Sequence, residues 1–389
     1  MKDEIFILAG EASGDLHGAM LVKRITGISP GSTFCGIGGS ELRREGAHLL
    51  HDYADFTAMG IVEPLLKIRF YARALREIPA LIRGRGISTA ILIDFPGFNL
   101  RLARKLAEQQ VRVLYYVSPQ IWAWHYARIR QIKKYVYAII VFYPFEEDMY
   151  RNAGVRAYFL GNPLVDIVQQ RLASAGPLND TLAKPVIALL PGSRISEAKR
   201  HLDPMLGAAK LLWKRYGGTI LVPVLSGTTG DFIRDRVRKV RSTGVDIRIL
   251  FDNTYRAIER ADLLITSSGT ATLEAAILEK PMIVIYRVGI LFELLARIFV
   301  KVENISLVNI VAGKQICPEL LQRAASAQRI FHEASTLLDN PEITGKMITE
   351  IRMVKRKLGD PGAMERIARK VVSLIGEEEP YPQQKTERM

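Results

Sequence analysis

The sequence is short of cysteine and of long apolar runs. Its two cysteines, Cys35 and Cys317, are too few for a disulfide framework or a four-cysteine zinc site, which favours a reducing compartment. The longest apolar stretches, around 135–144 and 289–300, fall well below the roughly 18–20 residues that span a bilayer. Residues 1–20 lack the basic and apolar segments of a signal peptide. We therefore expect a cytoplasmic protein that is not integral to a membrane.

The chain contains fewer acidic than basic residues. The chain has 54 Lys and Arg against 40 Asp and Glu, a net charge of +14, which attracts nucleic acid, anionic lipid headgroups or phosphorylated substrates. A nucleic-acid-binding protein needs aromatic side chains interleaved on a basic face, whereas the aromatic cluster here follows a strand that we expect to be buried. We expect no nucleic-acid partner, and keep that function as an alternative from another class.

The usual metal and nucleotide motifs are missing. The sequence has no Asp-x-Asp, Walker-type Gly-x-x-x-x-Gly-Lys-Ser/Thr, His-Glu-x-x-His or Cys-x-x-Cys. Cys35–Gly39 lacks the full Gly-x-Gly-x-x-Gly spacing of a nicotinamide site. We expect no metal and no cofactor, so that arginine, backbone amides and helix dipoles would neutralise any bound phosphate.

Short β-branched runs alternate with amphipathic stretches, a pattern typical of parallel sheets covered by helices. The alternation breaks at 174–185, which is rich in Gly, Pro and Asn and is a candidate linker. We expect an α/β protein of two Rossmann-like domains, 1–175 and 185–345, with C-terminal helices and a tail at 346–389 that pack on the first domain or are exchanged in a dimer. The expected strands are 4–9, 32–37, 89–94, 111–117, 138–142, 158–160, 186–190, 219–224, 246–250, 262–266 and 282–286.

Ligands of such sheets bind beyond the carboxyl ends of the strands, so the loops there are informative. Gly10–Asp15 is either a plain turn, with Ser13 or Asp15 capping the next helix, or part of a site that also uses Glu11. Asp94 ends an apolar strand as either a cap or a general base. The residues alone leave both questions open.

Two loops of the second half suit an anion. Residues 190–194 join a strand to a helix, and Arg194 is either a phosphate ligand or an ordinary surface arginine. Residues 267–274 open a helix with small hydroxylic side chains, as either a phosphate cradle or a Ser/Thr N-cap. The candidates in this second loop are Ser268, Gly269, Thr270 and Glu274.

Taken together, these loops resemble the lipid-A-disaccharide synthase family. The resemblance runs in order from about residue 5 to 370, and the segment with Trp122 and Trp124 is its most specific part. It implies an inverting, metal-independent glycosyltransferase of the two-Rossmann GT-B type. The matching segments are Gly10–Asp15, Met59–Glu63, Asp94–Asn99, Tyr116–Trp124, Leu190–Arg194, Ser268–Glu274, Asn309, Ala312–Gly313 and Pro318–Gln322.

The implied reaction joins UDP-2,3-diacylglucosamine to 2,3-diacylglucosamine 1-phosphate, giving the β-1,6-linked disaccharide 1-phosphate and UDP. A UDP-N-acetylglucosamine 2-epimerase or a peptidoglycan-type transferase would share the fold and the nucleotide pocket. Neither explains the segment that contains Trp122 and Trp124.

The resemblance also implies residue roles. Asp94 would be the base for the acceptor 6-hydroxyl and Arg194 a ligand of the diphosphate. Many relatives have Asp at Gly97 and His at Asn162, so Asp94 is expected to be the single essential acid. Ser268, Gly269 and Thr270 would line the phosphate pocket, Glu274 would face the ribose, and Asn309 and Glu319 would line the same pocket.

A basic amphipathic helix is expected at 66–85. It suits an anionic bilayer surface, and the alternative is a domain helix with a solvated basic face. Residues 290–299 are a second, more apolar candidate. The resemblance further implies a homodimer, and we expect a peripheral location on the inner face of the cytoplasmic membrane. The membrane-contact candidates are Lys67, Arg69, Phe70, Arg73 and Arg76.

Overall fold

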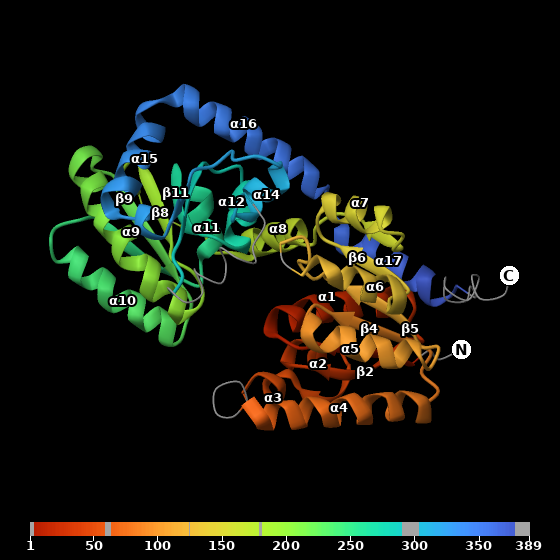
Figure 1. Cartoon of the computed structure of the whole chain (residues 1–389). Helices are drawn as coiled ribbons and strands as arrows, with labels where there is room; N and C mark the ends of the chain where they lie inside the picture. Colours follow the sequence, from red (N-terminus) through yellow and green to blue (C-terminus); the bar gives the residue numbers. More distant parts are fainter. Residues whose placement is uncertain (1–3, 59–63, 124, 179–180, 290–302, 378–389) are drawn as a thin grey trace. The chain divides into compact units, whose positions relative to one another are not determined.

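A computed structural model describes residues 4–58, 64–123, 125–178, 181–289 and 303–377 (Figure 1). It divides the chain into two compact units. Unit 1 comprises Met1–Pro163 and Asp360–Met389, and unit 2 comprises Leu164–Gly359.

Unit 1 is built on a seven-stranded parallel sheet in the order β3-β2-β1-β4-β5-β6-β7. Helices cover both faces, so most strands are continuous apolar runs and not alternating ones. The strand β3 was not expected, because its sequence His-Leu-Leu-His-Asp is polar at both ends and lies at the sheet edge. The strands are β1 (Glu4–Ala9), β2 (Thr33–Gly38), β3 (His48–Asp52), β4 (Thr89–Ile93), β5 (Arg112–Tyr116), β6 (Ala138–Val141) and β7 (Ala157–Phe159).

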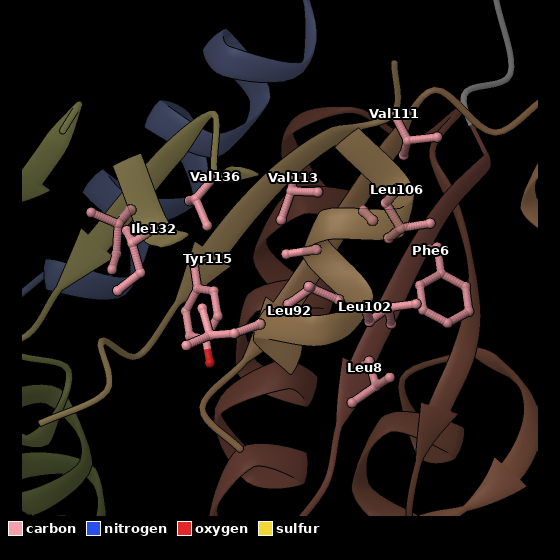
Figure 2. Close-up of a cluster of buried hydrophobic side chains, with 14 of the residues drawn as sticks. Phe6, Leu8, Leu92, Leu102, Leu106, Val111, Val113, Tyr115, Ile132 and Val136 are labelled. Carbon is pink, nitrogen blue, oxygen red and sulfur yellow. The ribbon is translucent and has the colours of Figure 1, made fainter. Parts of the chain in front are cut away.

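Two apolar cores lie on the two faces of this sheet, because successive side chains of a strand point to opposite sides. Phe6 and Leu8 of β1 belong to a core that includes side chains of the helices α4, α5 and α6. Figure 2 shows part of this core, with Leu102 of α5 and Ile132 of α6. Ile5 and Ile7 pack on the other face with α1 and α17. The helices of unit 1 are α1 (Ala12–Ile28), α2 (Ser40–Arg44), α3 (Tyr53–Ala58), α4 (Pro64–Gly84), α5 (Pro96–Ala107), α6 (Ile129–Tyr135), α7 (Pro144–Asn152) and α17 (Ala363–Ile375).

The C-terminal helix α17 completes unit 1 by packing on α1. Arg112 donates to the backbone carbonyls of Leu374 and Ile375 at 2.8 and 2.7 Å. The carboxylate of Glu377 accepts a hydrogen bond from Tyr137 and forms an ion pair with Arg156, both at 2.7 Å. Unit 1 therefore contains a segment from the far end of the chain.

Unit 2 is built on a six-stranded parallel sheet in the order β10-β9-β8-β11-β12-β13. In both units the strand order reverses beside the first strand, at β1/β4 and β8/β11, which is where open α/β sheets bind ligands. The strands are β8 (Val186–Leu190), β9 (Thr219–Val224), β10 (Ile247–Phe251), β11 (Leu263–Ser267), β12 (Met282–Tyr286) and β13 (Glu319–Leu321). The helices are α8 (Leu164–Ser174), α9 (Ile195–Tyr216), α10 (Thr228–Arg241), α11 (Thr254–Arg260), α12 (Thr270–Ile277), α14 (Leu307–Ala312), α15 (Ala327–Asp339) and α16 (Pro341–Leu358).

The expected α/β fold with two parallel sheets is confirmed, but the boundaries between the units differ from the sequence pattern. Helix α8 belongs to unit 2, because it packs on α11 and α12 and the side chain of Arg256 donates to the carbonyl of Ala175. The glycine- and proline-rich stretch at 174–185 is thus internal to unit 2. The C-terminal segment 346–389 is divided, with α16 in unit 2 and α17 in unit 1.

Several expectations fall on residues outside the described part of the chain, namely 59–63, Trp124 and the second membrane candidate at 290–299. The basic helix expected at 66–85 is α4, which continues through Pro79. Among the helices of the described residues, none combines the length and the apolar character that crossing a membrane requires.

Candidate functional site

Asp94 lies directly after β4, in a turn that is strained and tightly held. Asp94 and Phe95 have φ values of 45° and 46°, in the left-handed region that costs energy for residues other than glycine. The Asp94 carbonyl accepts hydrogen bonds from the Tyr115 hydroxyl at 2.5 Å and the Asn99 side chain at 2.8 Å. The Asp94 amide donates to the carbonyl of Tyr116 at 3.0 Å. Strand β5 and helix α5 therefore fix where this carboxyl group stands.

The carboxyl group of Asp94 is electrostatically perturbed. Burial raises its pKa to about 6, the negative charge of Glu11 adds to this effect, and the Phe95 amide opposes it. A carboxylate with a pKa near the working pH is suited to accept a proton, because it is deprotonated and still basic. Gly10 is required next to this turn, because a Cβ there would lie 2.5 Å from the Phe95 ring.

The segment Gly10–Asp15, where β1 leads into α1, makes contacts other than those that the sequence predicted. Glu11 and Ser13 are exposed, and helix α1 has Glu11 at its N-cap without a side-chain cap bond. The prediction that Ser13 or Asp15 caps this helix is wrong. The buried carboxylate of Asp15 instead accepts from the amides of Gly39 at 2.6 Å, Glu41 at 3.0 Å and Leu42 at 3.2 Å. Asp15 thus serves the start of α2.

Sequence reasoning missed one buried acid of unit 1, Glu146. Its Oε1 accepts the indole N–H of Trp122 at 3.0 Å, and its Oε2 accepts the amides of Phe142 and Tyr143 at 3.2 and 3.3 Å. The available signal was local, because an acid at the third position of a helix that begins with proline is typical of an N-terminal capping interaction.

Arg194 stands at the N-terminus of α9 in unit 2. Three quarters of its side chain is exposed, and Nη1 lies 3.3 Å from Glu197 Oε1. Gly192 has a φ of 110°, and a Cβ there would lie 2.6 Å from Glu197 Oε2, so the turn needs glycine. The guanidinium is therefore exposed beside amides that begin a helix, an arrangement suited to an anion.

His201 connects two loops of unit 2 and was not predicted. Its Nε2 accepts the amide of Arg287 at 3.0 Å, so Nδ1 carries the proton and donates to the carbonyl of Pro191, 3.1 Å away. Burial lowers its pKa, which keeps the ring neutral at physiological pH. His201 therefore ties the loop after β8 to the chain after β12.

The loop between β11 and α12 follows the expected pattern of a turn opening a helix. Helix α12 begins at Thr270, its N-cap is Gly269 with a φ of 149°, and no side chain caps it, so the Ser/Thr N-cap alternative is wrong. The Ser268 hydroxyl donates instead to the carbonyl of Ile305 at 3.1 Å. Thr270 is exposed. The helix therefore offers its first turn without a capping side chain.

Glu274 lies one turn inside α12. Its Oε1 accepts the hydroxyl of Tyr255 at 3.0 Å, and burial raises its pKa. The hydrogen bond from Tyr255 opposes that rise. One carboxylate oxygen is thus engaged by α11, and the side chain is held at a defined position.

Asn309 and Glu319 form one network inside unit 2. Glu319 accepts from the amides of Ile305 and Ser306, both at 2.9 Å, and from Asn309 Nδ2 at 2.7 Å. Asn309 Oδ1 accepts from the amide of Cys317 at 3.0 Å. Direct contact with a nucleotide would require these side chains to give up bonds within the protein. The geometry favours an indirect role, holding the start of α14 beside β13.

A pocket of about 240 Å³ opens at the carboxyl ends of β9 and β10. Its wall includes Leu225 and Phe251, which are 55 % and 56 % exposed. The Arg234 guanidinium lies 5.7 Å from the centre of the Phe251 ring. The sequence did not predict this pocket, because its residues come from the loop after β9, the first turns of α10 and the end of β10, and they form no recognisable motif.

Comparison with solved structures identifies the fold. The putative UDP-N-acetylglucosamine 2-epimerase of Listeria monocytogenes aligns over 97% of this chain and 98% of its own, with a TM-score of 0.66 and 14% identity. The UDP-GlcNAc 2-epimerase of Neisseria meningitidis, bound to UDP-GlcNAc, aligns over 96% and 99%, with a TM-score of 0.62 and 12% identity. At such identities the likeness shows the shared two-sheet GT-B fold and nothing about the reaction.

Comparison of sequences is more specific. Residues 5–368 match the family model described as lipid-A-disaccharide synthetase. The lipid-A-disaccharide synthase of Syntrophus aciditrophicus (strain SB) is 40% identical over 378 residues, covering 95% of this chain and 97% of its own. That of Geobacter sulfurreducens is 38% identical over 378 residues, covering 96% and 98%. The chain therefore belongs to the lipid-A-disaccharide synthetase family of glycosyltransferases.

Proposed function

We propose that this protein joins UDP-2,3-diacylglucosamine to 2,3-diacylglucosamine 1-phosphate, forming the β-1,6-linked disaccharide 1-phosphate and releasing UDP. The observation that carries the proposal is the partly buried, backbone-pinned Asp94 in a chain of this family. Its raised pKa suits the one proton transfer that the reaction needs.

In this mechanism the Asp94 carboxylate takes the proton of the acceptor 6-hydroxyl as that oxygen attacks the anomeric carbon. The C–O bond to the diphosphate breaks as the new glycosidic bond forms on the opposite face, so the configuration inverts. Arg194 and the first turn of α12, with Ser268, Gly269 and Thr270, stabilise the negative charge that develops on the departing UDP. Glu274 binds the ribose, and Asn309 and Glu319 support the pocket indirectly.

The test is UDP release from UDP-diacylglucosamine with and without the monosaccharide 1-phosphate. We expect UDP to appear only when both substrates are present, in a 1:1 ratio with a β-linked disaccharide identified by mass and anomeric proton coupling. Conversion of UDP-N-acetylglucosamine to its 2-epimer without an acceptor would overturn the proposal and favour the epimerase alternative.

We also propose that α4 docks on an anionic membrane, on the inner face of the cytoplasmic membrane, where diacylated substrates reside. Arg69, Arg73 and Arg76 are exposed on this helix, whereas Phe70 is half-buried against the core of unit 1. The side chain of Lys67 lies outside the described part of the chain. The basic side chains therefore support surface binding, and Phe70 supports it less than expected.

Sedimentation with vesicles tests this docking. We expect binding to anionic vesicles at low salt and release at high salt, with roughly 1 kcal/mol per basic residue near the surface. Arg69→Gln combined with Arg76→Gln should weaken it, whereas Arg236→Gln with Arg238→Gln, on α10 of unit 2, removes equal charge and should not. Equal binding to neutral vesicles, or tighter binding to DNA, would contradict the proposal. The homodimer rests on family resemblance alone, and light scattering tests it.

A further inference from the structure

Glu146 is a buried acid to which the proposed mechanism gives no role. It is 1 % exposed and lies in the first turn of α7. Both of its oxygens accept hydrogen bonds, from the indole of Trp122 and from the amides of Phe142 and Tyr143. These three partners can only donate, and a further hydrogen bond from the Ser118 side chain also favours the charged form. The environment therefore matches a carboxylate, because a protonated acid would turn one acceptor into a competing donor.

The partner of Glu146 belongs to the loop that follows β5. This loop leaves the sheet at Val117, whose φ of 64° is unusual for a β-branched residue. The indole of Trp122 packs edge-on against Phe145 of α7, with ring centres 5.4 Å apart. Phe145 in turn stacks on Tyr143, with ring centres 5.7 Å apart and planes nearly parallel. The Tyr150 hydroxyl of α7 also accepts from the Ser118 hydroxyl at 3.1 Å and donates to the carbonyl of Pro119 at 3.4 Å. The loop is thus attached to α7 at both its start and its tryptophan.

The same loop leaves the sheet beside the Asp94 turn. Strands β4 and β5 are neighbours, the Asp94 amide donates to the Tyr116 carbonyl, and the Tyr115 hydroxyl donates to the Asp94 carbonyl. A shift of the loop after β5 therefore acts on the segment next to the reacting carboxylate. A misplacement of about 1 Å at such a site can cost roughly a hundredfold in rate.

We propose that Glu146 is a positioning residue: by holding Trp122 it keeps residues 118–123 in the place where they align the acceptor sugar beside Asp94. The inference rests on the proposed function, and it concerns the acceptor and not the UDP-sugar. It assigns a purpose to the tryptophan-containing segment that the nucleotide pocket leaves unexplained.

This arrangement has a pH dependence. Burial raises the pKa of Glu146 to about 7, and the hydrogen bonds from Trp122 and the two amides oppose that rise. The ionisable neighbours of Glu146 are the phenols of Tyr143 and Tyr150. Burial raises the pKa values of both phenols, and the charge of Glu146 raises them further. As the pH falls through about 7, the acid takes up a proton and its bond to the indole is weakened.

The first measurement is kinetic and uses Glu146→Gln. This variant keeps the volume but places an NH₂ group among donors, so we expect kcat/KM for the acceptor to fall about tenfold or more. The KM for UDP-diacylglucosamine should stay within about twofold of the wild-type value. Glu147→Gln is the matched control, because Glu147 lies next on α7 and accepts the amide of Phe159 at 3.0 Å. The control should retain wild-type kinetics for both substrates.

The second measurement tests the coupling between the two side chains. Trp122→Phe removes the indole donor, so Glu146→Gln in that background should add little further loss if the two act as one unit. Additive losses from the two substitutions would contradict the proposal. Equal falls for donor and acceptor in Glu146→Gln would also contradict it, because they would indicate general destabilisation of unit 1.

The third measurement does not depend on activity. In the ¹⁵N-labelled protein, the indole signal that disappears in Trp122→Phe belongs to Trp122. We expect this signal to shift with a midpoint near pH 7 in the wild type and to stay constant in Glu146→Gln. A constant wild-type signal, or a shift without any change in acceptor kinetics, would overturn the positioning role. A wild type that releases no UDP with both substrates would instead overturn the proposed function, and this inference with it.

Discussion

Each unit places a candidate residue beside the point where its strand order reverses, Asp94 after β4 in unit 1 and Arg194 after β8 in unit 2, but the two residues differ in their surroundings. Asp94 of unit 1 is partly buried, its backbone is strained, and two side chains hold its carbonyl. Arg194 of unit 2 is three-quarters exposed and has one long contact to Glu197. A proton acceptor needs desolvation to raise its basicity, whereas an anion ligand needs an exposed charge that can reach the ligand. The difference in burial thus matches the different roles that we propose for two residues on either side of the same kind of switch point.

The substitution that tests this contrast most severely is Asp94→Asn. The amide cannot accept a proton, so turnover should fall by about 10²–10⁴-fold while both substrates still bind. The measurement is steady-state UDP release, with calorimetry for substrate binding. Retention of more than about a tenth of the wild-type rate would move the base to the segment Gly10–Asp15, where Glu11 is the exposed acid.

Stability provides the control for that variant. The folded-state pKa of Asp94 is raised to about 6, above the ordinary unfolded value, so the desolvated carboxylate costs stability as the pH rises through that interval. Asp94→Asn removes this cost at pH 7. Its Tm there should be no lower than that of the wild type, which separates lost chemistry from lost folding.

The substitution Arg194→Ala tests whether this exposed arginine binds the diphosphate of the UDP-sugar. Loss of a charge-assisted contact to phosphate should weaken UDP-sugar binding by about 1.5–3 kcal/mol and leave acceptor binding unchanged. Calorimetry with UDP measures the first quantity directly. The matched control is Arg323→Ala, because Arg323 is an exposed arginine elsewhere in unit 2, and it should bind UDP as the wild type does. Unchanged UDP affinity in Arg194→Ala would remove this residue from the phosphate site.

The dependence of activity on pH tests the proposed role of the partly buried Asp94. In the Glu146→Gln background, where position 146 does not titrate, activity should fall as the pH drops through about 6, because protonation removes the base. The loss should reach about tenfold per unit below that value. Glu11→Gln removes a negative charge that raises the pKa of Asp94, so the acid limb should move to lower pH. A limb that stays in place would show that Glu11 does not act on the titrating group.

The smallest expected effect is that of EDTA. In the proposed mechanism, positive charge for the departing diphosphate comes from the exposed Arg194 and the uncapped first turn of α12, so excess chelator should leave UDP release unchanged. Loss of activity that Mg²⁺ or Mn²⁺ restores would show that unit 2 does not neutralise the leaving group by itself.

The layers of the fold were predictable from local sequence, because buried parallel strands are apolar runs and the helices between them are amphipathic. Two edge strands could not be predicted from this pattern, because β3 is partly polar and β13 has only three residues. The boundary between the units also could not be predicted from it, because α8 is assigned to unit 2 by what it packs against and not by local composition. Loop positions at the ends of β4, β8 and β11 were predictable, since strand ends follow from the same pattern.

What each candidate side chain does depends on contacts that local sequence does not contain. Asp15 was an apparent cap of the following helix, but its partners are amides 24 to 27 residues further along the chain. Glu146 and His201 act through groups that only folding brings to them. The raised pKa of Asp94 comes from burial and from the charge of Glu11, which is distant in sequence. Residue type sets what a group can donate or accept, while solvent exclusion and long-range neighbours set its charge and its partner.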